Sequence, residues 1–136
     1  MSYGVSAALQ EAVFQRLAAD ATLLLLVGAD IFDAAPSGLV PETYVSLGPE
    51  DVKDASDQGG AGAFHEFKVS VVSDAAGFRT AKDVAAAVSD ALIDAPLVLT
   101  RGRLVYLNFL SAKADRVQDA DTRRIDLKFR ARVEDN

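Results

Sequence analysis

Residues 67–92 read FKVSVVSDAAGFRTAKDVAAAVSDAL, and this stretch carries two different periodicities of apolar residues. In its first part every second residue is apolar, which is typical of a β-strand with one face toward water. In its second part apolar residues recur every three or four positions, which is typical of an amphipathic helix packed on a sheet. The strand positions are Phe67, Val69 and Val71, and the helix positions are Ala81, Ala85, Val88 and Leu92.

The turn between this strand and this helix raises the question of a phosphate site, because nucleotide-binding proteins hold phosphate at such a helix start. A phosphate loop needs a second glycine followed by Lys and Ser or Thr, and a dinucleotide turn needs three spaced glycines. Here Gly77 stands alone, and Asp74 would repel a phosphate. We therefore expect Ser73 or Asp74 to cap the helix, and we expect no nucleotide cofactor.

Two further helices are expected nearer the N-terminus. The first carries an apolar stripe at four-residue spacing, with Ser2 or Ser6 as its candidate cap. The second, ATLLLLV, is predicted to be short and mostly buried, with Asp20 as its N-cap and Gly28 as its stop. The stripe of the first helix consists of Val5, Leu9, Val13 and Leu17.

The remaining segments predict strands and turns. Gly48-Pro49 is expected to end one strand, and Arg101-Gly102 is expected to form a tight turn between two others. The expected strands lie at residues 31–32, 43–51, 63–73, 97–100, 104–112 and 121–134. Long alternating strands with amphipathic helices predict an α+β fold, a two-layer sandwich in which a mainly antiparallel sheet carries two long helices on one face.

The length and composition bound the organisation of the chain. We expect a single domain over residues 1–136, with a mobile acidic loop at about 50–62 and a projecting hairpin at about 112–123. The absence of cysteine excludes disulfides, zinc–thiolate sites and cysteine nucleophiles, and it fits a reducing cytosol. No apolar run approaches the roughly 20 residues that span a bilayer, and no signal peptide is recognisable, so no membrane contact is expected.

The charge is unevenly distributed along the chain. Residues 1–96 hold 5 Lys or Arg and 14 Asp or Glu, a net charge of −9, whereas residues 97–136 hold 9 and 6, a net charge of +3. Such asymmetry favours oriented association with a partner or with a second copy. It is too weak for a dedicated DNA-binding domain, which is usually basic overall.

Two groups of residues are candidates for chemistry. His65 is the only histidine, and its place in a strand beside Phe64 favours a structural role over catalysis. The acidic residues near position 50 are spaced by three, whereas calcium loops alternate their acids, so a solvated loop is expected and a weak cation site is the alternative. These acids are Glu50, Asp51, Asp54 and Asp57.

A basic stripe on the last strand, formed by Arg124, Lys128, Arg130 and Arg132, is the sharpest surface feature. Asp126 and Glu134 interleave with it, so one interpretation is a solvated strand face. A second is an electrostatic interface to an acidic neighbour, including an identical subunit, and a third is DNA contact, although no aromatic residues interleave. The candidate interface residues are Lys113, Arg116, Arg123, Arg124, Lys128, Arg130 and Arg132 on the basic side and Asp51, Asp54 and Asp57 on the acidic side.

Four segments together resemble one protein family. They are LQEAVFQRLAAD with LLLLVGADIFDAAP, then YVSLGPEDVKDAS, then HEFKVSVVSDAAGFRTAKDVAAAVSDALIDAPLVL, and finally RLVYLNFLSAKADRVQDADTRRIDLKFRARVE. In this order they resemble the tail completion, or tail terminator, proteins of long-tailed bacteriophages, prophages and gene transfer agents. The resemblance covers almost the whole chain and rests on packing and turn residues.

The resemblance implies a structural virion protein with no catalytic residue, cofactor or metal. It implies a ring, usually a hexamer, at the head-proximal end of the tail, assembled in the host cytoplasm. The ring would stop the tail tube protein from adding further subunits and would join the head–tail connector or stopper protein. DNA would pass through the lumen without specific recognition. The alternatives are a small cytosolic hydrolase or transferase that uses His65 and a carboxylate, and a dimeric binding domain.

Overall fold

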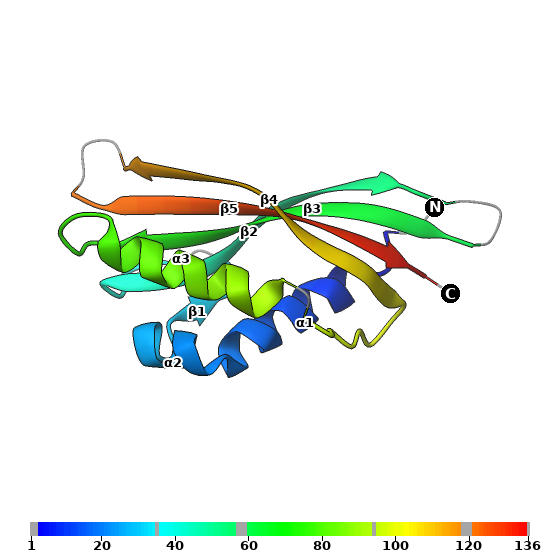
Figure 1. Cartoon of the computed structure of the whole chain (residues 1–136), viewed down its shortest axis with the longest axis horizontal. Coiled ribbons are helices and arrows are strands. Elements are labelled where there is room, and N and C mark those ends of the chain that lie inside the picture. The colour runs from blue at the N-terminus through cyan, green and yellow to red at the C-terminus, as the bar shows by residue number, and fades with distance from the viewer. Residues whose placement is uncertain (1–2, 35, 57–59, 94, 118–120, 136) are drawn as a thin grey trace.

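The computed structural model describes residues 3–34, 36–56, 60–93, 95–117 and 121–135. Within these ranges the chain forms three helices and a five-stranded sheet, and all three helices lie on the same side of the sheet (Figure 1). The elements in chain order are α1 (Ser6–Ala19), α2 (Ala21–Val27), β1 (Ile31–Phe32), β2 (Thr43–Asp54), β3 (Gly62–Ser73), α3 (Arg79–Leu92), β4 (Arg103–Arg116) and β5 (Arg123–Glu134).

The sheet is mixed, and its strand order is β1-β2-β3-β5-β4. β1 pairs with β2 in parallel, whereas the pairs β2–β3, β3–β5 and β5–β4 are antiparallel. The α+β class is therefore confirmed, and the expected antiparallel pairing holds for all but the short β1. β4 forms one edge of the sheet, so one side of this long strand has no neighbouring strand in the described chain.

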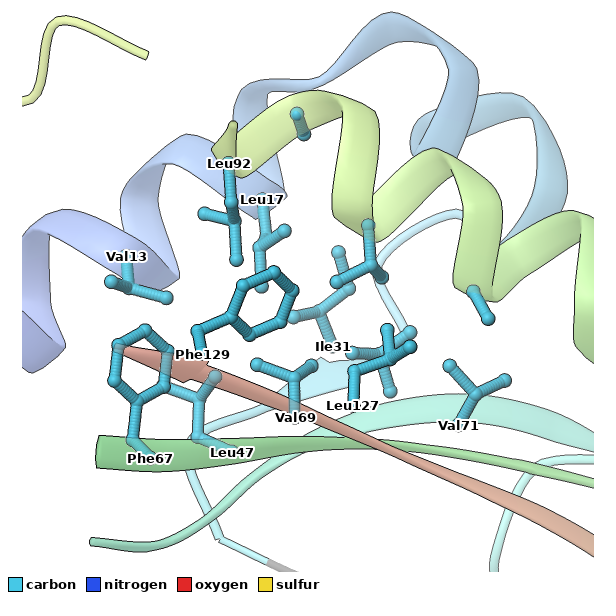
Figure 2. Packing of buried hydrophobic residues seen from close by; sticks show 14 of the residues in the cluster. Val13, Leu17, Ile31, Leu47, Phe67, Val69, Val71, Leu92, Leu127 and Phe129 are labelled. Atoms are coloured by element: carbon cyan, nitrogen blue, oxygen red, sulfur yellow. The ribbon is translucent and has the colours of Figure 1, made fainter. Parts of the chain in front are cut away.

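The hydrophobic core lies between the helices and one face of the sheet. Phe129 on β5 is fully buried and stacks on Phe67 of β3, with ring centroids 5.7 Å apart. Figure 2 shows Phe129 pointing from the sheet toward Leu17 and Leu92 on the helices. The predicted helix stripes are confirmed, because Val5, Leu9, Val13 and Leu17 of the first helical segment and Ala81, Ala85, Val88 and Leu92 of α3 are all buried.

The predicted end of the second strand is wrong. Gly48-Pro49 does not end β2; the strand continues to Asp54 through an irregularity between Leu47 and Glu50. Pro49 is tolerated there because an irregular position needs no N–H for the ladder of hydrogen bonds. At Gly48 there is little room for a side chain, because a Cβ would lie 3.2 Å from the Cβ of Lys68. The acidic loop expected at 50–62 therefore begins no earlier than Ala55.

The strand predicted at residues 97–100, as the first strand of a hairpin, is absent from the described structure. The described backbone of residues 97–100 forms no strand, and only Arg103–Arg116 pairs with β5. β4 extends four residues beyond the predicted end at Ala112, and β5 begins at Arg123. The projecting hairpin is thus mainly paired strand. Its residues 118–120 lie outside the described chain.

The helix caps match the predictions only in part. The side chain of Asp20 accepts a hydrogen bond from the Leu23 amide, and Gly28 ends α2 with φ +59°, as predicted. α3, however, follows Phe78 without a side-chain cap in the described chain. Ser73 instead bonds Thr43 at the end of β3, five residues before Phe78, so the prediction that Ser73 or Asp74 caps the helix is wrong.

α2 is much less buried than expected. Only Leu23 and Val27 are buried, whereas Leu24, Leu25 and Leu26 are 59%, 88% and 43% exposed. A helix that packs on one side covers positions three or four residues apart, here Leu23 and Val27, and the consecutive leucines between them face outward. In the part of the chain that the structure describes, no helix is long and apolar enough to cross a membrane.

Candidate interaction surface

The face of the sheet opposite the helices, here called the helix-free face, carries all four residues of the basic stripe. Strand alternation places the buried Ile125, Leu127 and Phe129 toward the helices, so the residues between them point to the helix-free face. Lys68 on β3 lies directly opposite Lys128 on β5. The basic residues of this face include Lys53, Lys68, Lys113, Arg124, Lys128, Arg130 and Arg132.

Glu66 holds the centre of this face together. Its Oε2 accepts hydrogen bonds from Nε and Nη2 of Arg130 at 3.0 and 2.6 Å, and its Oε1 lies 3.6 Å from Nζ of Lys128. The hydrogen bond from Arg130 holds the pKa of Glu66 below its ordinary value, and the charge of Lys128 acts in the same direction. One carboxylate thus offsets two cations of the stripe.

Phe64 lies beneath two arginines of the stripe. The guanidinium carbons of Arg130 and Arg132 lie 5.5 and 5.2 Å from the centre of its ring. Arg132 also donates a hydrogen bond to the carbonyl oxygen of Ala55 at 3.1 Å. The sequence shows no aromatic residue interleaved with the stripe. The structure supplies one from the neighbouring strand, because Phe64 lies on β3 whereas the stripe lies on β5.

Arg124 is held by its own polar cluster. Its Nε donates to Asp126 at 2.9 Å and its Nη2 donates to the hydroxyl oxygen of Ser70 at 3.1 Å, while Ser70 donates to Asp126 at 2.6 Å. The four basic residues of the stripe therefore all contact other residues of the same sheet. The helix-free face is a surface of paired charges with an excess of cations.

The hairpin cations do not join a single surface. Lys113 is on the helix-free face and lies 3.4 Å from Asp115. Arg116 and Arg123 face each other across the hairpin on the opposite side of the sheet. Arg123 is largely buried, stacks over Phe78 at 5.8 Å and donates to the carbonyl oxygen of Ala75. The structure therefore divides the seven predicted basic residues between the two faces.

The predicted acidic residues are also separated. Asp51 is exposed on the helix-free face opposite Glu66, and Asp54 ends β2. The hydroxyl of Ser56 donates to Asp54 at 2.7 Å and holds its pKa below the ordinary value. Asp57 lies outside the described residues. Among the residues described, no three acidic or histidine side chains form a group that could hold a metal ion.

His65, which is buried, and Glu50, which is partly exposed, form a structural cluster. His65 is fully buried, and its Nδ1 lies 3.4 Å from Oε2 of Glu50. The other carboxylate oxygen accepts hydrogen bonds from the hydroxyls of Ser6 and Tyr3. A serine hydrolase needs the imidazole between serine and carboxylate, whereas here the carboxylate lies between serine and imidazole. The cluster ties the start of α1 to β2 and β3.

Two apolar surfaces were missed by the sequence predictions. One is the exposed side of α2, formed by Leu24, Leu25 and Leu26. The other is an open groove of about 300 Å³ between α3 and β4, here called the α3–β4 groove. A run of four leucines in a seven-residue helix was the available signal for the first, because one buried face cannot hold them all. The groove had no signal in the sequence.

Comparison with known proteins gives a consistent result. Residues 11–134 match the family model described as Tail completion protein gp17. A chain in the structure titled "Virion of native gene transfer agent (GTA) particle" is 67% identical, with a TM-score of 0.92, and the match covers 98% of this chain and 99% of that chain. A search of curated proteins found no match.

Proposed function

This chain belongs to the tail completion protein gp17 family, and from that membership we propose that it forms a ring, expected to be a hexamer, at the head-proximal end of the tail tube. It is a structural virion component and not an enzyme. As a tail completion protein of a particle, it associates with other tail and head components. The ring, its position and its individual partners are the proposal.

In this proposal the ring ends the polymerisation of the tail tube protein and presents a surface to the connector or stopper protein of the head. The observation that carries it is the family match over residues 11–134 together with the likeness to a gene transfer agent virion chain. The Glu50–His65 cluster suits a structural subunit, since Glu50 accepts a hydrogen bond from Ser6 of α1 and lies beside His65 of β3, which fastens α1 to the sheet.

Passage of DNA through the lumen is also part of the proposal. A channel that lets DNA slide must not bind phosphates strongly, because each cation that neutralises a phosphate adds affinity. Arg124, Lys128 and Arg130 each contact a carboxylate of the same sheet. This pairing lowers the number of cations that any part of the helix-free face would offer to passing DNA.

The helix-free face is the proposed contact for an acidic surface of another tail or head component. Lys113 and Lys68 are exposed there, and the cations exceed the carboxylates. Asp51, Asp54 and Asp57 are proposed as the acidic residues of a complementary contact, as expected from the charge asymmetry. Exposed pairs contribute about 0–1 kcal/mol each, so such a contact sets orientation more than affinity.

The experiment compares particles with and without the protein. Light scattering after size-exclusion chromatography measures the mass of the assembled protein, and electron microscopy measures the length of tail tubes and the fraction joined to heads. We expect a closed oligomer that caps tubes, and tubes of uncontrolled length without heads in its absence. A dimer that leaves tube length unchanged would contradict the proposal and favour a dimeric binding domain.

A further inference from the structure

We infer that, in the proposed ring, the α3–β4 groove of one copy receives α2 of the next copy. The inference rests on the proposed ring, and it names the two surfaces that meet in it.

The helical side of the sheet is incompletely covered at β4. β4 is the edge strand, and α3 packs on β5 and β3. Leu107 is buried, but farther along the strand Phe109 is 44% exposed, although its ring packs edge-on against Phe129 at 5.9 Å. A long edge strand with a half-exposed aromatic residue is a surface that soluble proteins usually cover.

The shape of the groove suits a helix. One wall is α3, with Ala85 and Ala86, and the other is β4, with Ala112 and Ala114. These small side chains leave an open space of about 300 Å³ above the sheet. A second helix beside α3 would fill the space and would extend the helical cover to β4, because small residues allow close packing of a neighbouring helix.

α2 provides an apolar helix surface that the described residues of its own chain leave uncovered. Leu25 is 88% exposed and Leu24 is 59% exposed, whereas Leu23 and Val27 hold the helix on the core. Contiguous exposed leucines of this kind mark an interaction site more often than a solvated surface.

These two surfaces lie on opposite sides of the same molecule. α2 packs on β2 and α3, near the start of the sheet order, whereas β4 is the last strand. Figure 1 shows α3 between α2 and the far end of β4. One chain therefore cannot bring its own α2 into its own groove. A contact between opposite sides repeats from copy to copy and closes a ring when the rotation allows.

The charges around the two surfaces are complementary. Lys82 lines the groove, and Arg116 follows Ala112 and Ala114 on the same side of β4. Asp20 directly precedes α2, and Asp30 follows its end, where the Asp30 amide donates a hydrogen bond to the carbonyl oxygen of Val27. Opposite signs favour this head-to-tail contact over a two-fold contact of either surface with itself.

Disulfide trapping tests the contact directly, because the natural chain has no cysteine. The double variant Leu25→Cys with Ala112→Cys is assembled into the oligomer and oxidised with copper phenanthroline. We expect a ladder of covalent oligomers on a denaturing gel, which collapses under reduction. Each single-cysteine variant is the matched control, and we expect neither to cross-link, since only a two-fold contact would bring two identical cysteines together.

The outcomes separate the inference from the proposed function. A normal ring without a ladder would overturn the inference and leave the ring intact. Absence of any ring in the natural protein would contradict the proposed function itself. If the tube protein occupied the groove instead, the thiol of the Ala112→Cys variant would be protected from a maleimide only when tube protein is added, and this too would overturn the inference.

A second measurement uses affinity. Leu25→Ser should weaken the association of copies about tenfold or more, because the contact then loses the burial of a leucine side chain. The matched control is Leu39→Ser, since Leu39 is fully exposed and lies outside α2. Equal association of the Leu25→Ser variant and the natural protein in sedimentation experiments would contradict the inference.

Discussion

Glu66 and Arg130 face each other across β3 and β5, and Nη2 of Arg130 lies 2.6 Å from Oε2 of Glu66. Lys128 lies on the other side of the same carboxylate. The pair joins the two central long strands on the helix-free face, where no helix covers them. The charge pairing of Lys128 and Arg130 therefore depends on the fold, because their partner Glu66 lies on a different strand.

This pair predicts a pH dependence of stability. The hydrogen bond from Arg130 lowers the pKa of Glu66 in the folded state, so the contribution is present above the ordinary pKa of glutamate and is lost as pH falls through the lowered folded value. Glu66→Gln should remove that part of the acid dependence, measured by urea unfolding from pH 7 to pH 3. Asp83→Asn is the control, because Asp83 pairs with the highly exposed Arg79 on α3. An unchanged slope for Glu66→Gln would contradict the prediction.

The aromatic centre of the core predicts a large loss of stability on truncation. Phe129→Ala removes a fully buried ring that stacks on Phe67, and we expect a loss of about 3–5 kcal/mol in the free energy of unfolding. Phe109→Ala is the comparison, because Phe109 is 44% exposed and should lose less. Denaturant unfolding of both variants measures the difference. Equal losses would show that β4 contributes to the core as much as β5.

Only glycine is expected to fit without strain at position 102, in the turn before β4. Gly102 has φ +71°, and a Cβ there would lie 2.5 Å from the carbonyl oxygen of Glu134. Gly102→Ala should therefore destabilise the protein more than Gly28→Ala, where φ is +59° but no described atom lies within 4 Å of the added Cβ. Thermal unfolding of the two variants measures this. A Tm for Gly102→Ala equal to that of Gly28→Ala would refute the steric argument.

Substitution of the buried His65 should lower stability without abolishing the function of the protein in the particle. His65→Ala leaves a cavity beside Glu50 and should lower the free energy of unfolding by a few kcal/mol. Below its melting temperature the variant should still assemble and complete tails, measured by electron microscopy. Glu50→Gln should also lower the free energy of unfolding and leave assembly intact. It keeps the side-chain volume but changes the hydrogen bonds with Ser6, Tyr3 and His65. A folded His65→Ala variant that assembles normally but yields inactive particles would revive a catalytic role.

The helix-free face predicts a salt-sensitive contact with another virion component. Lys113→Gln combined with Lys128→Gln should reduce joining of tails to heads, and more strongly at low salt, where screening is weak. Arg79→Gln is the control, because Arg79 is highly exposed, as Lys113 is, but lies on α3. The fraction of joined particles is counted at two salt concentrations. Unchanged joining would mean that this face is solvated.

Several local features follow directly from the sequence. The alternation in residues 67–73 and 124–133 specifies long strands, because a period of two places alternate side chains on opposite faces. Exposure of the second face does not follow from it, since Ser70 and Val72 on the helix-free face of β3 are buried. Asp20 and Gly28 bound α2 as predicted, since capping and a positive φ depend on the residues themselves. The family resemblance rests on the same packing and turn residues, which is why it was recognisable without a structure.

Other features depend on which segments become neighbours. Periodicity shows that a face is apolar or charged, but not which element covers it. The pairing of β5 with β3 brings Glu66 and Phe64 to the basic stripe and turns apparently free cations into paired ones. The irregularity at Gly48-Pro49 is tolerated because of the place of these residues in the sheet. The exposure of Leu25 and the open groove beside Phe109 likewise arise from how three helices share one sheet, because a helix can cover only the strands it reaches.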